Sequence, residues 1–215
     1  MSKYTEPELD KAALITIDTQ RDTLDGQPFE IPGTSTALSN IGLLLDIFRS
    51  HSMPIIHIVR IYQRNGSNVD ICRREEVENG RQWVLEDSDG SQIATEFFTP
   101  DEVILDSSLL LSGGIQNIST NEVIIYKPRW GAFDNTPLEE YLGKLNVSTL
   151  IFTGCNYPNC PRTSIYEASE RDFRIILVTD AISSLNEQGK KEMANIGVEL
   201  MTAGKLADKL RLVSL

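Results

Sequence analysis

Short apolar segments rich in β-branched residues alternate along this chain with longer segments of helical pattern. The strand-like segments are 12–18, 54–60, 122–126, 147–153 and 174–179, and the helical ones are 35–50, 137–144, 161–172 and 187–203. A helix that links two strands of one sheet makes a right-handed crossover and leaves the strands parallel. The alternation therefore predicts an α/β protein with three layers, α/β/α, in which helices cover both faces of a mainly parallel sheet.

Length and pattern predict one domain over residues 1–215. A chain of 215 residues with 40% hydrophobic side chains suffices for one sizeable core, and no linker or repeat interrupts it. The segment 61–121 is the least regular part and is too long for a plain connection inside a compact domain. We therefore expect part of it to be structured, with a short extra strand at 103–105. The rest is expected to cover a site or to contact another subunit.

The acidic balance of the chain narrows the class of partner. A net charge of −11 argues against nucleic acid and against an anionic membrane, because both require a basic face. The chain has three cysteines, no signal peptide and no apolar run near the roughly 18 residues that span a membrane, which indicates a reduced, cytoplasmic protein. The expected partner is a small molecule.

Reactive side chains follow three of the expected strands. Asp18 and Lys127 come directly after apolar strands, and Cys160 follows the strand that ends near Thr153. In open α/β sheets, ligands bind beyond the carboxyl ends of the strands. An acid, a base and a thiol are therefore expected to converge at one edge of the sheet. The alternative for Asp18 and Lys127 is a structural ion pair.

The turn that carries Cys160 lies between a strand and a helix. Pro161 suits the first helical position, which places Cys160 at the helix N-cap. There the unsatisfied N–H groups and the helix dipole stabilise a thiolate and lower its pKa, and the same N–H groups can hold an oxyanion. The alternative is a small buried packing residue. Neither Cys72 nor Cys155 has the spacing of a zinc site or a redox pair.

Four motifs occur in order along nearly the whole chain. Residues 14–20 form an apolar strand that ends in Asp-x-Gln, and residues 127–133 read Lys-Pro-Arg-Trp-Gly-Ala-Phe. Residues 153–164 run from Thr-Gly through the cysteine turn to Arg-Thr-Ser, and residues 178–181 read Val-Thr-Asp-Ala. Together they resemble the isochorismatase-like cysteine hydrolase superfamily, which includes nicotinamidases and carbamoylsarcosine amidases. The resemblance implies a Rossmann-like sheet and a homo-oligomer.

The resemblance also implies a mechanism of acyl transfer. Cys160 would attack a carbonyl, Asp18 would take the thiol proton and pass it to the leaving nitrogen, and water would release the acid from a thioester. Lys127 would place positive charge beside both groups. The peptide bond between Cys155 and Asn156 would be cis, and the N–H groups of Asn156 and Cys160 would form the oxyanion hole. Hydrolysis of an amide or carbamoyl C–N bond is the expected reaction.

Two other functions stay open within this resemblance. Isochorismatases proper cleave a vinyl ether and generally lack the cysteine, so the presence of Cys160 favours C–N hydrolysis. A non-catalytic protein that binds a small molecule is the second alternative. The chain has only two histidines, His51 and His57, without an Asp-x-His spacing, and His57 lies inside an apolar strand. We therefore expect no catalytic metal and no cofactor.

Several residues near the motifs are candidates for the substrate pocket. They are Gln20, Arg60, Trp130, Phe133 and Tyr157. Further arginines follow in the irregular segment, at positions 64, 73, 74 and 81. Arginine suits planar recognition of a carboxylate, but acidic residues are interleaved with these arginines, which favours surface or subunit ion pairs.

Overall fold

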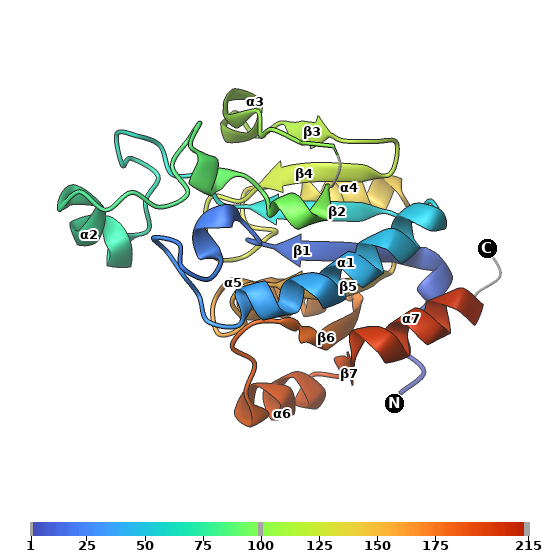
Figure 1. Ribbon diagram of the computed structural model, residues 1–215. Helices are drawn as coiled ribbons and strands as arrows, with labels where there is room; N and C mark the ends of the chain where they lie inside the picture. Colours follow the sequence, from blue (N-terminus) through green and yellow to red (C-terminus); the bar gives the residue numbers. More distant parts are fainter. Residues whose placement is uncertain (1, 99–100, 213–215) are drawn as a thin grey trace.

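The computed structural model describes residues 2–98 and 101–212, and its centre is a seven-stranded sheet. The strands lie in the order β3-β4-β2-β1-β5-β6-β7 (Figure 1). Their bounds are β1 (Ala12–Ile17), β2 (Ile55–Val59), β3 (Ile115–Asn117), β4 (Glu122–Tyr126), β5 (Thr149–Gly154), β6 (Arg174–Ile182) and β7 (Glu199–Met201). Each neighbouring pair is parallel except β3 and β4, which are antiparallel. The predicted α/β class with a mainly parallel sheet is confirmed.

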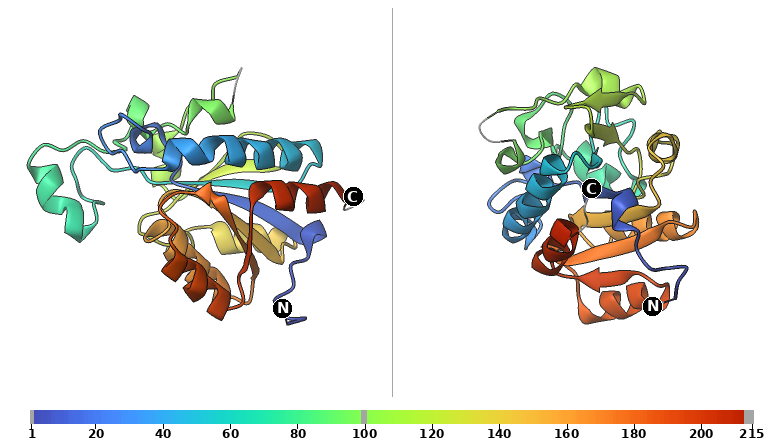
Figure 2. Two further views of the ribbon diagram at one scale, coloured as in Figure 1. Left: turned by 60° about the horizontal axis from the view of Figure 1, so that its bottom comes forward. Right: turned by 90° about the vertical axis from the view of Figure 1, so that its right-hand side faces the viewer.

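Helices cover both faces of this sheet (Figures 1 and 2). One face packs against α1 (Thr34–Ser50) and α7 (Ala203–Leu212), and the other against α4 (Leu138–Lys144), α5 (Cys160–Ser169) and α6 (Glu187–Asn195). The remaining helices are short: η1 (Leu9–Lys11), η2 (Arg21–Thr23), η3 (Ile71–Arg73), α2 (Arg74–Glu78), η4 (Asp89–Ser91), η5 (Thr95–Phe97) and α3 (Ser107–Leu111). No helix in the described ranges is long and apolar enough to cross a membrane.

The central strands are apolar along their whole length because both of their faces are covered. In β1, Leu14 packs into the core beneath α1, while Ala13, Ile15 and Ile17 pack into the core on the opposite face. All six residues of β1 are buried. Full burial of such side chains stabilises the fold by roughly 1.5–3 kcal/mol each, which is the main reason that this segment forms a central strand.

Two predicted elements are wrong. The helix expected at 187–203 is instead α6, the short strand β7 and the beginning of α7, because Gly197 takes a left-handed backbone conformation (φ 82°) that ends the helical region. The segment 103–105 is not a strand. The N–H of Leu105 donates to the side chain of Gln92 (2.8 Å) instead of to a neighbouring strand. The third strand of the chain, β3, was not predicted.

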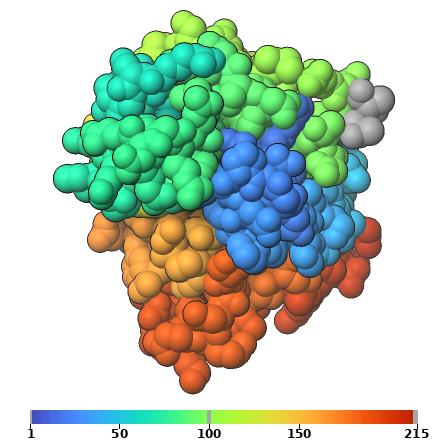
Figure 3. Space-filling model, turned by 60° about the vertical axis from the view of Figure 1, so that its left-hand side comes forward, coloured from blue at the N-terminus to red at the C-terminus, as the bar shows by residue number. Residues whose placement is uncertain are grey.

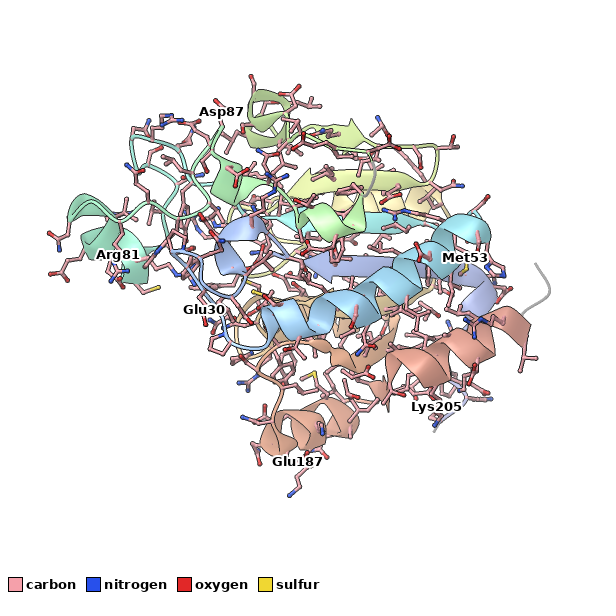
Figure 4. The ribbon with its side chains drawn as sticks, viewed as in Figure 1. Glu30, Met53, Arg81, Asp87, Glu187 and Lys205 are labelled. Atoms are coloured by element: carbon pink, nitrogen blue, oxygen red, sulfur yellow. The ribbon has the colours of Figure 1, made fainter. Side chains whose placement is uncertain are left out.

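A projecting segment, residues 62–85, lies beyond the carboxyl ends of the central strands, and we call it the arm. It contains η3 and α2 and extends away from the sheet (Figures 1 and 2). A bridge between Tyr62 and Leu85 closes its base. In Figure 4 the labelled Arg81 and Glu30 lie at this end of the molecule, and Met53, which precedes β2, lies at the other end. The arm is held by a small core of its own that includes Trp83 and Phe29.

Candidate active site

The central strands bring their next residues to one edge of the sheet. Asp18 follows β1, Arg60 follows β2 and Lys127 follows β4, and these three strands are neighbours. The parallel ladder continues into the site, because the N–H of Asp18 donates to Ile58 (2.9 Å) and the N–H of Lys127 donates to Val59 (3.0 Å). Both side chains are therefore placed by sheet hydrogen bonds rather than by a free loop.

Lys127 contacts both of the other predicted catalytic residues. Its Nζ lies 2.9 Å from Oδ2 of Asp18 and 3.2 Å from Sγ of Cys160, and it also donates to the carbonyl of Arg129 (3.2 Å). The ammonium is buried, with only 1% of the side chain exposed. The other carboxylate oxygen of Asp18, Oδ1, is buried and has no hydrogen-bond partner in the described part of the chain. The structure thus brings together the acid, the base and the thiol that the sequence predicted at strand ends.

Close packing between the ends of β1 and β5 allows Asp18 and Cys160 to lie near each other. The N–H of Cys155 donates to the carbonyl of Ile17 (2.8 Å), and a Cβ placed on Gly154 would lie 2.2 Å from the same oxygen. Gly154 also has a φ of 110°, which L side chains rarely adopt. Asp18, at the end of β1, has a φ of 47° and stands in the left-handed region that aspartate tolerates better than most residues. Glycine at position 154 therefore lets the two strand ends meet.

The turn at residues 155–160, which carries Cys160, differs in one respect from the sequence prediction. Cys160 is the first residue of α5 rather than its N-cap, and Asn159 precedes the helix. The peptide bond between Cys155 and Asn156 is cis. The turn is anchored by the N–H of Tyr157, which donates to Ser183 (2.9 Å). The N–H groups of Asn156 and Cys160 donate to no carbonyl in the described residues, so both are free to bind an oxygen of a ligand.

The thiol of Cys160 is neutral in the resting site, contrary to the lowered pKa expected from the helix dipole. Burial raises the pKa of Cys160 to about 12, the charge of Asp18 adds to the increase, and Lys127 opposes it. Burial alone would lower the pKa of Lys127, but its interactions with Asp18 and Cys160 outweigh burial and raise it. The site therefore holds a protonated thiol beside a charged lysine.

A cavity of about 410 Å³ opens above these residues and includes space that is open to solvent. It is lined by residues from the strand ends, the segment before α1 and the arm: Asp18, Gln20, Thr23, Phe29, Ile31, Arg60, Asp70, Arg73, Val84, Lys127, Arg129, Trp130, Cys155, Asn156 and Cys160. Figure 3 shows this side of the molecule, where the arm (teal to green) meets the segment before α1 (blue). Gln20 was predicted from the sequence, and the arm covers this cavity as expected for part of the segment 61–121, whereas Thr23, Phe29 and Ile31 had no periodic signal and were not predicted.

Two of the five pocket candidates lie elsewhere. Phe133 packs against Phe173 (ring centroids 5.9 Å apart) in the core beneath α4 and α5. Tyr157 is buried, and its hydroxyl donates to the carbonyl of Gly189 (3.0 Å), which fastens the turn that carries Cys160 to α6. Both residues lie in the core rather than in the cavity wall, Tyr157 in the turn that carries Cys160 and Phe133 in residues 127–133, which we call the lysine loop.

Gln20 and Arg60 line the cavity, but protein contacts occupy their polar groups. The Gln20 amide donates to the carbonyls of Arg60 (2.8 Å) and Ser91 (2.6 Å) and accepts from the Arg60 N–H (2.9 Å). The Arg60 guanidinium donates to Tyr126, Lys127, Asn68 and Asp70. Only its Nε is buried without an acceptor in the described residues. These two residues chiefly hold the cavity wall in shape.

The other arginines of the irregular segment divide into two groups. Arg64 donates to the carbonyl of Glu86 (3.0 Å), and Arg81 pairs with Glu76 (3.8 Å) at the surface, as the ion-pair interpretation expects for Arg81. Arg73 forms no ion pair in the described ranges and lines the cavity instead. Neither Arg73 nor Arg74 forms a surface ion pair within the described ranges, and an ion pair with another subunit stays a prediction.

His57 has the core role that its position in a strand suggested. Its ring lies 2.8 Å from Thr16 Oγ1 and 2.8 Å from Glu122 Oε1, and Arg49 pairs with the same carboxylate (2.7 Å). Burial lowers the pKa of His57 against the opposing effect of Glu122. Across residues 2–98 and 101–212, no group of three or more His, Cys, Asp or Glu side chains could hold a metal ion.

Curated relatives share this chain's pattern over much of its length. It is 23% identical over 205 residues to an Arabidopsis thaliana protein named a probable inactive nicotinamidase, covering 92% of this chain and 95% of that protein. It is 27% identical over 166 residues to the N-carbamoylsarcosine amidase of an Arthrobacter species, covering 74% of this chain and 54% of that protein. The chain thus spans about half the length of that amidase.

Solved structures show the same fold. An isochorismatase family protein from Desulfovibrio vulgaris superposes with a TM-score of 0.78 at 25% identity, covering 94% of this chain and 98% of that one. The nicotinamidase/pyrazinamidase of Bacillus subtilis superposes with a TM-score of 0.67 at 19% identity, covering 89% and 99%. The family model for the isochorismatase domain matches residues 12–205. The chain therefore belongs to the isochorismatase family.

Proposed function

We propose that this protein is a cysteine hydrolase that cleaves an amide or carbamoyl C–N bond of a small molecule. The contact of one buried lysine with both a carboxylate and a thiol at the mouth of a cavity carries this proposal. Relatives named N-carbamoylsarcosine amidase and ureidoacrylate amidohydrolase, the latter matched over 78 residues, support it. The small-molecule substrate would enter the cavity that Cys160 lines.

The first half of the reaction forms a thioester. As the Cys160 sulfur bonds to the substrate carbonyl carbon, the thiol proton moves to the Asp18 carboxylate, and the carbonyl π electrons move to oxygen. The free N–H groups of Asn156 and Cys160 hold that oxygen. When the oxygen electrons return, the C–N bond breaks and the nitrogen takes the proton from Asp18. Ammonia or an amine leaves, and the acyl group stays on sulfur.

Water completes the cycle. Asp18 accepts a proton from the water that attacks the thioester, the C–S bond breaks, and the sulfur recovers the proton from Asp18. Lys127 stays charged throughout, paired first with the Asp18 carboxylate and then with the developing thiolate. The buried site therefore contains one negative and one positive charge at each stage, and proton transfer from sulfur to Asp18 changes only which partner the ammonium faces.

The raised pKa of the thiol explains why a general base is required. Because burial, and after it the charge of Asp18, raise the pKa of Cys160 to about 12, the thiol is almost entirely protonated at pH 7. A preformed thiolate is thus too rare to serve as the nucleophile. Transfer of the proton to Asp18 removes the repulsive charge at the moment when the thiolate forms.

Ammonia release provides the test. Wild type and Cys160→Ala would be compared on a panel of primary amides, ureas and carbamoyl compounds, with Cys72→Ala as the matched control, because Cys72 is exposed and lies outside the cavity. We expect turnover in wild type and Cys72→Ala and none in Cys160→Ala. Equal turnover in Cys160→Ala would disprove the nucleophile. An absence of turnover in wild type across the panel would count against C–N hydrolysis of these compounds and leave the vinyl-ether hydrolase and the binding protein as the alternatives, which vinyl-ether substrates would then distinguish.

A further inference from the structure

The charges that line the cavity do not cancel. Lys127 pairs with Asp18 (2.9 Å), and Arg60 pairs with Asp70 (3.4 Å). Two further cations line the same cavity, Arg73 and Arg129, and neither has a carboxylate within ion-pair distance in the described ranges. The protein as a whole is strongly acidic, with a net charge of −11, so a cavity with two unpaired cations runs against its overall balance.

Arg73 is held in place by aromatic rings. Its guanidinium carbon lies 4.7 Å from the ring centroid of Phe29 and 4.7 Å from that of Trp130. These contacts come from three separate parts of the chain: the segment before α1, the arm and the lysine loop. Cation–π contacts stabilise a charged group without using its N–H donors. The side chain is therefore fixed in orientation before any ligand arrives, which lowers the entropy cost of binding.

Most hydrogen-bond donors of Arg73 are unused. A guanidinium has five N–H donors, and in Arg73 a single hydrogen bond, from Nη1 to the Tyr62 hydroxyl (3.0 Å), reaches a protein acceptor in the described residues. The guanidinium carbon of Arg60 lies 4.6 Å from the centroid of the Tyr62 ring. The Nε of Arg60 is also buried without an acceptor in the described residues. Arg73 and Arg60 thus both line the cavity with donors that lack a protein acceptor in the described residues, and the buried Nε of Arg60 is costly to leave unpaired.

The reacting groups lie within electrostatic reach of this cation. Burial alone would lower the pKa of Arg73, but its interactions with Tyr62, Cys160 and Asp70 outweigh burial and raise the pKa, so the guanidinium is charged. Arg129 follows Lys127 by two residues. Its guanidinium donates hydrogen bonds to the carbonyls of Pro128 (2.7 Å) and Asn68 (3.5 Å). Arg73 is thus the cation with the most free donors.

We propose that the substrate carries a carboxylate, or a similar planar anion, away from its scissile carbonyl, and that Arg73 binds this group with support from Arg129. The inference rests on the proposed function and identifies its substrate class. A planar guanidinium held on aromatic rings and carrying unused donors matches the two oxygens of a carboxylate. Arg73 is a specificity residue that contacts the far end of the substrate and takes no part in bond breaking.

Two pairs of test compounds isolate the carboxylate. Succinamate differs from butyramide, and N-carbamoylglycine from ethylurea, by a carboxylate in place of a methyl group. The kcat/KM for ammonia release would be measured with wild type, Arg73→Gln and Arg74→Gln. Arg74 is the matched control, because it is the next residue of the arm, is exposed and does not line the cavity.

We expect wild type and Arg74→Gln to prefer the acid of each pair. Arg73→Gln should lose about 30-fold in kcat/KM on the acids, the value of one charged hydrogen-bonding partner of about 2 kcal/mol, and change little on the methyl compounds. Equal losses on both members of a pair would show a structural role and overturn the inference. A wild type that prefers the methyl compounds would overturn it as well.

Binding to Cys160→Ala separates this inference from the proposed function. Calorimetry on Cys160→Ala and on Cys160→Ala with Arg73→Gln would use the same acids and methyl compounds, without any reaction. Binding of the acids that is lost with Arg73→Gln supports carboxylate recognition even if wild type hydrolyses none of the compounds. If Cys160→Ala binds neither acid more tightly than its methyl counterpart, carboxylate recognition is wrong even where hydrolysis is observed.

Discussion

Replacement of Lys127 by methionine removes the cation on which the proposed chemistry depends, while keeping an unbranched side chain of similar length. Sγ of Cys160 lies 3.2 Å from Nζ of Lys127. At an effective dielectric constant of about 20, a thiolate and an ammonium at that distance attract each other by about 5 kcal/mol. Loss of this attraction should lower kcat for ammonia release by a factor of 10³ to 10⁴, since about 1.4 kcal/mol corresponds to a factor of ten.

Stability should fall as well, and it must be separated from catalysis. Lys127→Met leaves the Asp18 carboxylate buried without its cation, which costs about 3–5 kcal/mol of unfolding free energy. The double variant Asp18→Asn with Lys127→Met removes both the carboxylate and the ammonium, so it leaves no buried charge without a partner. This double variant should recover much of the stability in urea denaturation and remain inactive.

Lys144→Met provides the control for loss of a lysine charge. Lys144 pairs with Glu140 on the surface, where both side chains are more than two thirds exposed, and such pairs contribute little. Its kcat and urea midpoint should match those of wild type. If Lys127→Met is stably folded and keeps kcat within a factor of ten of wild type, the proposed role of the ammonium is refuted.

Three further predictions concern the thiol of Cys160, the close packing of β1 against β5, and the buried carboxylate of Glu122. Asp18→Asn should lower the pKa of Cys160 and speed its alkylation by iodoacetamide at pH 8–9, since Asp18 is among the causes that raise that pKa; an unchanged rate would contradict the electrostatic account. In thermal melts, Gly154→Ala should destabilise the fold by about 3 kcal/mol or prevent folding, because the new Cβ would lie 2.2 Å from the carbonyl oxygen of Ile17. The control Gly143→Ala, in α4, has open space for its Cβ and should be neutral or stabilising. Hydrogen bonds and charges from His57 and Arg49 outweigh burial and lower the pKa of Glu122 to about 2. The contribution of Glu122 to the free energy of unfolding is therefore full above pH 4.5 and is lost as the pH falls toward 2. In urea titrations over that range, wild type should lose about 3 kcal/mol more than Glu122→Gln, and parallel curves would refute the assignment.

The sequence predicted the centre of the fold because its signal is local. Strands such as β1 are buried on both faces and therefore read as continuous apolar runs, and the residue after each strand is placed by the ladder itself. Asp18 and Lys127 could be assigned to one edge of the sheet for this reason, and Cys160 followed because its short turn begins where β5 ends. The region after Glu187 was harder, because a three-residue strand such as β7 is too short for its pattern to differ from that of a helix.

The parts of the site that were missed depend on tertiary packing. Phe133 packs against Phe173 and Tyr157 bonds to Gly189, and no periodicity records such contacts between residues that are far apart in the sequence. The raised pKa of Cys160 comes from burial and from Asp18, more than a hundred residues away, whereas the sequence showed only the nearby helix. Arg73 was interpreted as a partner of neighbouring acids because its aromatic contacts lie far from it in sequence.

The arrangement of strands in the sheet also determines when this site can come into existence. β1 lies beside β5, so that Leu14 faces Ile151 in the register, and the thiol follows β5 along the chain. Contacts of such long sequence separation form slowly, because a large loop must close first. A nascent chain on the ribosome exposes Asp18 long before Cys160 has been synthesised. The reactive constellation is therefore absent throughout most of synthesis and appears only when the centre of the sheet closes.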